Sequence, residues 1–403
     1  MNEPTLTREA WGLYVHVPFC AQKCDYCAFY SASADGALVN RYVSALTREL
    51  ELRSSSVARP PSTIFFGGGT PSLLNLRQWG QVLEVIRGLG WDRPVEWTVE
   101  CNPATVSRDK AELLRAGGVN RVSMGVQSMD DGLLDLLGRV HTREMVLRSF
   151  ETLRGAGFES VNLDLMFAIP GQTLAQWEGT LAEVLGLGSE HLSCYEVIYE
   201  EDTPLFERLR TGEVRVDEDL AAAMYETLVE RAEGAGFVQY EIANWGRTRR
   251  VGEVGEGVFQ EPGVPRFACR HNVNYWRGGA YMAVGPSASG FEGGVRYRNV
   301  ASTARYCEAL ERGELPRDWR EELAPGARAG EVAAFGLRMN AGWPWEAFRV
   351  ATGRDLREGW AEDMSRLEAR GWGVREADRF RLTRAGLRFA DAAGSEFLRP
   401  AGA

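Results

Sequence analysis

Lysine is almost missing from this sequence: of its 403 residues, only Lys23 and Lys110 are lysines. Arginine supplies the remaining positive charge, and acidic residues still outnumber basic ones, 56 to 46, for a net charge of −10. A nucleic-acid-binding protein normally presents a basic surface. The charge balance therefore argues against nucleic acid as a partner of the whole chain.

Long uncharged apolar runs are missing too. A membrane-spanning helix needs about 18 or more such residues, and no run in the sequence approaches that length. The first twelve residues, MNEPTLTREAWG, lack the apolar centre of a secretory signal. We therefore expect a cytoplasmic protein without a membrane span, while peripheral membrane contact and a homodimer stay open.

Between residues 12 and 198 the sequence alternates short apolar runs with longer helical patterns. The runs expected to be strands are 12–17, 63–68, 95–101, 121–126, 160–167 and 191–198. Strands that alternate with helices favour a parallel sheet, and chemistry in such folds gathers at the carboxyl ends of the strands. The pattern predicts an α/β fold with a partial (β/α)6 barrel over residues 1–235.

Two smaller regions are expected after the barrel. Residues 236–315 form a connecting region, with a strand at 237–245 and a flexible, Gly-rich insertion at 246–266. Residues 316–403 combine a helix near 329–340, a second helix and two short strands, which predicts a winged-helix-like α+β module. The second helix carries an apolar stripe of Leu356, Trp360, Met364 and Leu367. Arginines and acidic residues are balanced in this module, so a structural or partner-binding role is expected rather than DNA binding.

Three of the seven cysteines are clustered as Cys20-Ala-Gln-Lys-Cys24-Asp-Tyr-Cys27, directly after the first strand. Zinc sites usually show paired C-x-x-C units and four ligands. Three thiolates can instead hold a [4Fe–4S] cluster and leave one iron open. The amine and carboxylate of S-adenosylmethionine (SAM) could bind that iron. A zinc knot or three buried thiols are the alternatives.

This cysteine spacing resembles the motif of the radical SAM superfamily. The resemblance continues in order through FFGGGTPS, E-x-NP, NRVSMGVQS, LGRVHT, NLDLMFAIPGQT, YEIANW, HNVNYW and GPSAS. The sequence is thus similar to the oxygen-independent coproporphyrinogen III oxidase-like family, and within it to the heme chaperones. The resemblance covers nearly the whole chain and implies a radical SAM barrel, a [4Fe–4S] cluster held by the three cysteines, SAM and heme.

The resemblance also implies which residues contact SAM. These are Tyr14, Tyr26, Gly68, Gly69, Thr70, Glu100, Gln127, Arg139, Asp164 and Ile198. The plainer interpretations are a tight turn for the glycines, a cap for Glu100, a surface ion pair for Arg139 and a buried, hydrogen-bonded carboxylate for Asp164. His16 is a further candidate for contact with SAM or substrate, whereas His141 and His191 are expected to support the scaffold. Ala168 stands where the family pattern has glycine.

The segment His271-Asn-Val-Asn-Tyr275-Trp276 is the candidate heme site. Histidine is a common axial ligand of heme iron, and aromatic side chains can stack on a porphyrin. Cys269 is a second possible ligand. A structural histidine in an aromatic core explains the segment equally well.

Two functions follow from the resemblance. One is a heme chaperone that delivers heme to acceptor proteins, and the other is oxygen-independent coproporphyrinogen III oxidase. The oxidases carry a further cysteine where this chain has Phe29, and they begin with a longer extension before the first motif. Together with HNVNYW, these features favour the chaperone. No catalytic residue is assigned, and a radical SAM enzyme acting on another substrate stays open.

Overall fold

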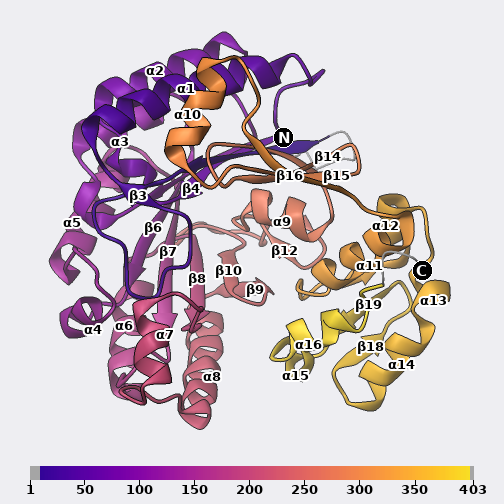
Figure 1. Cartoon of the computed structure of the whole chain (residues 1–403). Coiled ribbons are helices and arrows are strands. Elements are labelled where there is room, and N and C mark those ends of the chain that lie inside the picture. Colours follow the sequence, from indigo (N-terminus) through magenta and orange to yellow (C-terminus); the bar gives the residue numbers. More distant parts are fainter. Residues whose placement is uncertain (1–9, 400–403) are drawn as a thin grey trace.

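The computed structural model describes residues 10–399. Twelve strands in this range form a single large sheet (Figure 1). Six neighbouring strands at its centre are parallel and follow chain order. They are β1 (Trp11–Val17), β4 (Thr63–Gly68), β5 (Glu96–Cys101), β6 (Arg121–Gln127), β7 (Ser160–Phe167) and β8 (His191–Glu196). These are the six strands predicted from the sequence, and they confirm the α/β fold with a partial barrel.

Helices connect these strands and cover the outer face of the sheet (Figure 1). The connecting helices are α1 (Gly36–Ser54), α2 (Leu76–Gly88), α3 (Arg108–Ala116), α4 (Asp131–Leu136), α5 (Arg143–Gly155) and α6 (Leu174–Gly186), with short 3-10 turns at Pro71–Leu73 and Pro103–Thr105. After β8 follow α7 (Pro204–Arg210) and α8 (Glu218–Gly234). Capping boxes begin two of them, at Asn75 and Thr173. Each cap satisfies helix amides that have no partner inside the helix. None of the described helices is long and apolar enough to cross a bilayer.

The sheet extends beyond the six predicted strands on both sides. On one side β13 (Ala280–Val284) lies parallel to β1, and β14 (Ser289–Glu292), β15 (Val295–Asn299) and β16 (Arg317–Glu322) continue antiparallel. On the other side lie β10 (Asn244–Arg247) and β9 (Phe237–Glu241). Strands from all three predicted regions therefore share one sheet, and the boundaries at 235 and 315 stay predictions.

Two predictions between residues 237 and 266 need correction. The single strand expected at 237–245 is a hairpin, because the chain turns at residues 242–243 and β10 pairs back on β9. The insertion at 246–266 is not wholly irregular, since β11 (Phe259–Glu261) pairs with β12 (Val264–Pro265). Two short helices follow, α9 (Arg270–Trp276) and α10 (Thr303–Glu311), while the short strands β2 (Phe19–Cys20) and β3 (Ala32–Ser33) lie between β1 and α1.

The C-terminal residues form a winged-helix-like module with its own apolar core. Its elements are α11 (Pro325–Gly336), β17 (Trp343–Pro344), α12 (Trp345–Thr352), α13 (Leu356–Gly359), α14 (Ala361–Ala369), β18 (Gly373–Arg375), β19 (Arg379–Leu382), α15 (Arg384–Leu387) and α16 (Ala390–Ser395). The predicted stripe from Leu356 to Leu367 is buried in this core. The chain breaks between α13 and α14 at Trp360, so the stripe spans two helices rather than one.

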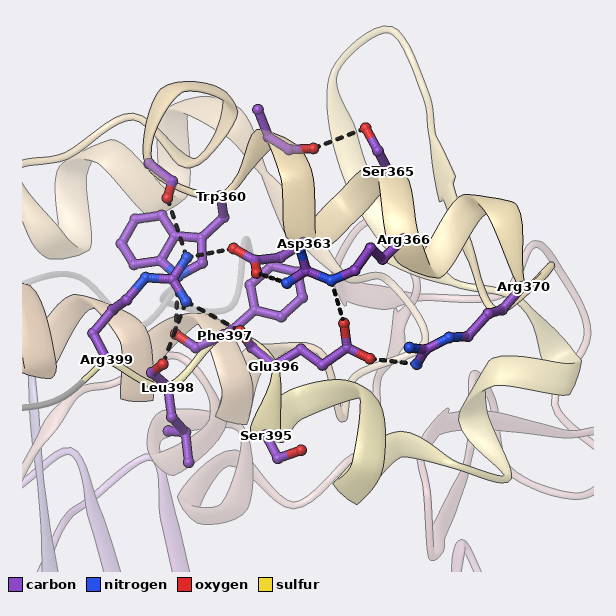
Figure 2. Close-up of polar contacts among 12 residues, drawn as sticks. Trp360, Asp363, Ser365, Arg366, Arg370, Ser395, Glu396, Phe397, Leu398 and Arg399 are labelled. Atoms are coloured by element: carbon purple, nitrogen blue, oxygen red, sulfur yellow. Dashed lines mark hydrogen bonds and ion pairs between the residues drawn. The ribbon is translucent and has the colours of Figure 1, made fainter.

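Ion pairs tie residues 396–399 to α14 (Figure 2). Asp363 is buried and accepts from both Arg366 and Arg399, and Glu396 accepts from Arg366 and Arg370. The Trp360 indole donates to the Phe397 carbonyl at 2.8 Å. This network fixes the segment that closes the module.

Candidate cofactor site at the carboxyl ends of the strands

The cysteine cluster lies on a loop between β2 and β3, beside the carboxyl end of β1. Backbone hydrogen bonds from Asp25 N to Leu137 O, at 3.1 Å, and from Leu205 N to Asp25 O, at 2.9 Å, hold this loop against α4 and α7. Cys20, Cys24 and Cys27 are all partly buried and line one cavity of about 470 Å³. The topology therefore places three free thiols where chemistry is expected in this fold.

The thiols fit a cluster better than a single ion. Among residues 10–399, no three His, Cys, Asp or Glu side chains converge closely enough to hold one metal ion. Thiolates of a [4Fe–4S] cluster each bind a different iron, so such convergence is not required. Burial raises the pKa of Cys20 and Cys27, because a thiolate loses hydration there. Bound iron would supply the compensating positive charge.

Arg139 joins the cysteine loop to the barrel. Its Nη1 donates to Cys24 Sγ at 3.4 Å, and its Nη2 donates to the Gly125 carbonyl at 2.7 Å. Its Nε is buried and has no hydrogen-bond partner among residues 10–399. A buried, unpaired donor is costly, and Arg139 lines the cavity. A carboxylate bound in the cavity would satisfy it, as the carboxylate of SAM could. Arg139 is thus not the surface ion pair of the plainer interpretation.

The glycine loop after β4 packs against the cysteine loop. A Cβ on Gly69 would lie 2.7 Å from Phe19 O and 2.8 Å from Val17 O, and one on Gly68 would overlap the His16 ring. Gly69 N donates to Val17 O at 2.8 Å. Close backbone approach therefore requires both glycines, which supports the tight-turn interpretation. They line the cavity as well, together with Thr70.

Two carboxylates face the cavity from the inside of the barrel. Burial and the charge of Asp164 raise the pKa of Glu100 to about 8, and burial also raises the pKa of Asp164. Asp164 accepts from Asn162 Nδ2 at 2.8 Å and from Ser123 Oγ at 3.2 Å. Glu100 accepts only from Gly68 N, at 3.2 Å, among the hydrogen bonds found in residues 10–399. A cationic amine would stabilise the ionised form of both carboxylates.

The remaining predicted SAM contacts fall at the same place, with one exception. Tyr26, Gln127 and Ile198 line the cavity, and Ile198 is exposed at its rim. Tyr14 does not line it, because its hydroxyl lies below the loops and contacts His16 Nδ1 at 3.1 Å. His16 in turn reaches the Tyr30 carbonyl with Nε2, at 3.0 Å. Both residues support the loops from beneath.

Sequence reasoning missed several residues that line the cavity, including Ser123, Tyr195 and Cys101. Ser123 pairs with Glu100 of β5, and Tyr195 pairs with Met166, two residues after Asp164 on β7. Both therefore lie on the sheet face that carries the predicted carboxylates, because side chains alternate along a strand. That alternation was the available signal. Cys101 directly follows Glu100 and had no signal of its own.

The HNVNYW segment lies at the opposite, amino end of the strands. His271 is 1% exposed, and both ring nitrogens are hydrogen-bonded, Nδ1 to Thr63 Oγ1 at 2.8 Å and Nε2 to Tyr275 Oη at 2.7 Å. Burial and the charge of Arg121 lower the pKa of His271 to about 3. Trp276 is half-buried, and Cys269 is buried with its thiol 3.5 Å from Glu96 Oε1. Heme binding by His271, Tyr275 and Trp276 stays a prediction, and iron ligation through one His271 nitrogen requires the hydrogen bond at that nitrogen to break.

Comparison with known proteins agrees with this geometry. The radical SAM superfamily matches residues 14–184, and the HemN C-terminal domain matches residues 323–389. Heme chaperone HemW of Bacillus subtilis (strain 168) is 34% identical over 85% of this chain and 87% of its own. The chain belongs to the HemW family. A second HemW, of Lactococcus lactis subsp. lactis (strain IL1403), is 31% identical over 96% of both chains.

The fold of this HemW family member also matches a solved structure along nearly its whole length. Coproporphyrinogen III oxidase (HemN) from Escherichia coli covers 97% of this chain and 91% of its own, with a TM-score of 0.79 and 21% identity. This likeness shows the shared radical SAM fold. It does not by itself separate a HemW chaperone from an oxidase.

Proposed function

We propose that this chain is a heme chaperone that holds a [4Fe–4S] cluster with SAM, binds heme and delivers it to acceptor proteins. The observation that carries the proposal is the identity of 31–34% with proteins named heme chaperone HemW, over 85–96% of the chain. The similarity includes the cysteine loop and the C-terminal module, so it is not a likeness of the barrel alone.

The residues of the cavity have separate tasks in this proposal. Cys20, Cys24 and Cys27 hold the cluster, and Arg139 binds the SAM carboxylate with a planar guanidinium. Glu100 accepts from the SAM amine beside the glycine loop. Once bound, such a cluster supplies an electron for radical chemistry on SAM. The protein contributes orientation and a low-dielectric cavity.

Oxygen-independent coproporphyrinogen III oxidase is the second candidate, and one position argues against it. Phe29 is 68% exposed and lines the cavity, where the resemblance implies that an oxidase carries a cysteine. A phenyl ring offers no thiol for redox or hydrogen-atom chemistry. It offers instead an apolar surface at the cavity entrance.

A turnover assay separates the two functions. The protein is reconstituted anaerobically with iron and sulfide, then mixed with SAM, a reductant and coproporphyrinogen III, and products are resolved by chromatography. We expect no doubly decarboxylated product from protein with a full cluster and bound SAM. Product formed over many turnovers would show that the chain is an oxidase.

A further inference from the structure

The HNVNYW segment closes the amino end of the barrel from the inside. Glu96, the first residue of β5, accepts from two backbone amides at the start of α9, Arg270 N at 3.0 Å and His271 N at 3.1 Å. Its Oε1 also accepts a hydrogen bond from the Cys269 thiol. A charged acceptor satisfies amides that a helix cannot pair by itself. Glu96 therefore fixes α9 to the sheet rather than leaving it at the surface.

His271 fills the space between β1 and β4. Its ring nitrogens contact Thr63 on β4 and Tyr275 one helical turn later. A Cβ on Gly12 of β1 would lie 3.0 Å from the His271 ring, so the ring occupies space that a larger residue at position 12 would need. The imidazole is thus held on three sides at the amino end of the barrel strands, which we call the floor of the barrel.

Phe65 continues this contact toward the cavity. Its ring stacks on His271 with centroids 5.3 Å apart and planes 27° apart. A Cβ on Gly67 would lie 2.9 Å from Phe65 Cε1 and 3.0 Å from Glu100 Oε2. Gly68, the next residue, donates its amide to Glu100. An unbroken chain of packed atoms therefore runs from His271 through Phe65 to the glycine loop and Glu100.

We propose that His271 is a positioning residue for the SAM site, acting from the barrel floor by holding Phe65 against the glycine loop. The inference rests on the proposed function for the identity of the ligand. Packed side chains of this kind transmit changes because an interior has few alternative arrangements. If heme iron withdrew His271 from the floor, Phe65 would lose its support. Heme ligation through His271 and tight SAM binding would then oppose each other.

Two substitutions at one position test this role. His271→Ala removes the ring, and His271→Phe keeps a ring against Phe65 but removes both imidazole nitrogens. The first readout is hydrogen exchange of residues 64–70 in the chain without cluster or SAM. The second is SAM titration of the reconstituted protein. Phe65→Leu is measured alongside, because His271→Ala leaves a cavity that can lower folding yield. Phe348→Ala is the control for losing a buried ring elsewhere, in the core of the C-terminal module.

We expect faster exchange at residues 64–70 and SAM binding weaker by about three- to thirtyfold in His271→Ala and Phe65→Leu, the range for coupling through packed neighbours. His271→Phe and Phe348→Ala should stay close to the parent chain in both measurements. Unchanged exchange in His271→Ala and Phe65→Leu would overturn the positioning role. So would equal damage by His271→Phe and His271→Ala, since the ring would then not matter. If the parent chain itself bound no SAM, the proposed function would fail, while exchange would still decide the role of His271.

Discussion

The guanidinium of Arg139 donates to the sulfur of Cys24 at 3.4 Å, although the two residues lie 115 positions apart in the sequence. Together with the hydrogen bond from Arg139 to the Gly125 carbonyl, this contact links the cysteine loop to β6. It places a permanent positive charge beside a thiol that the cluster would need as a thiolate. The same side chain retains a buried, unpaired Nε for a ligand in the cavity.

Arg139→Leu should therefore weaken SAM binding to the reconstituted protein. Hydrogen bonds to charged groups contribute about 1.5–3 kcal/mol, which corresponds to roughly ten- to a hundredfold in affinity. Calorimetric titration with SAM measures the change. Arg143→Leu is the matched control, because Arg143 forms an exposed ion pair with Glu183. Equal SAM affinity in the Arg139 variant and the parent would show that this guanidinium does not bind the ligand.

Cys24→Ala should abolish the visible absorption of the cluster after anaerobic reconstitution, because only two thiolates of the motif remain. Iron and sulfide content, measured together with the spectrum, quantify the loss. Cys307→Ala provides the comparison, since Cys307 is a buried residue of α10 that does not line the cavity, and its loss should leave the spectrum intact. A full [4Fe–4S] spectrum from the Cys24 variant would contradict the ligand assignment.

Glu100 should make the cofactor-free protein less stable as pH rises. Its pKa of about 8 in the folded chain lies above the value of about 4.3 expected when unfolded. Between these values the folded chain keeps a proton that the unfolded chain has lost, so the free energy of unfolding falls with increasing pH. Glu100→Gln removes this pH-dependent contribution to the free energy of unfolding, and it should raise Tm more at pH 8 than at pH 5. The same Tm difference at both pH values would mean that Glu100 is not held protonated.

Asp363→Asn should destabilise the C-terminal module, because the buried carboxylate accepts from both Arg366 and Arg399 (Figure 2). We expect a loss of about 1–3 kcal/mol in the free energy of unfolding, measured by urea denaturation. Asp391→Asn serves as the control, since Asp391 is 88% exposed and its pair with Arg338 is a surface ion pair worth about 0–1 kcal/mol. Similar effects of the two substitutions would refute the importance of the buried network.

The barrel and most of its cavity could be predicted because their signals are local. Each of the six strands is a short apolar run, and the residues after it reach the same edge through the topology of a parallel sheet. The cysteine loop and the glycine loop therefore met at the predicted place. Gln127 and Arg139 were implied by the family resemblance, and the structure places Gln127 at the end of β6 and Arg139 after α4.

The remaining features depend on contacts between distant residues. His271 is held by Thr63, 208 positions away, and its backbone by Glu96, 175 positions away. Nothing near His271 in the sequence indicates that it is buried between these partners. Likewise, β13 becomes a strand by pairing with β1, and its segment has no alternation of apolar and polar residues from which a strand could be predicted. The turn at residues 242–243 has neither glycine nor proline, which explains why the hairpin looked like one strand.

Heme titration of the anaerobically reconstituted protein tests the central claim most directly. Protein with a full cluster and SAM is titrated with heme, and the Soret absorption is followed to saturation. The account predicts a saturable, stoichiometric heme complex that can be separated from free heme on a sizing column. A Soret band that never saturates, or heme that elutes apart from the protein, would contradict a heme chaperone.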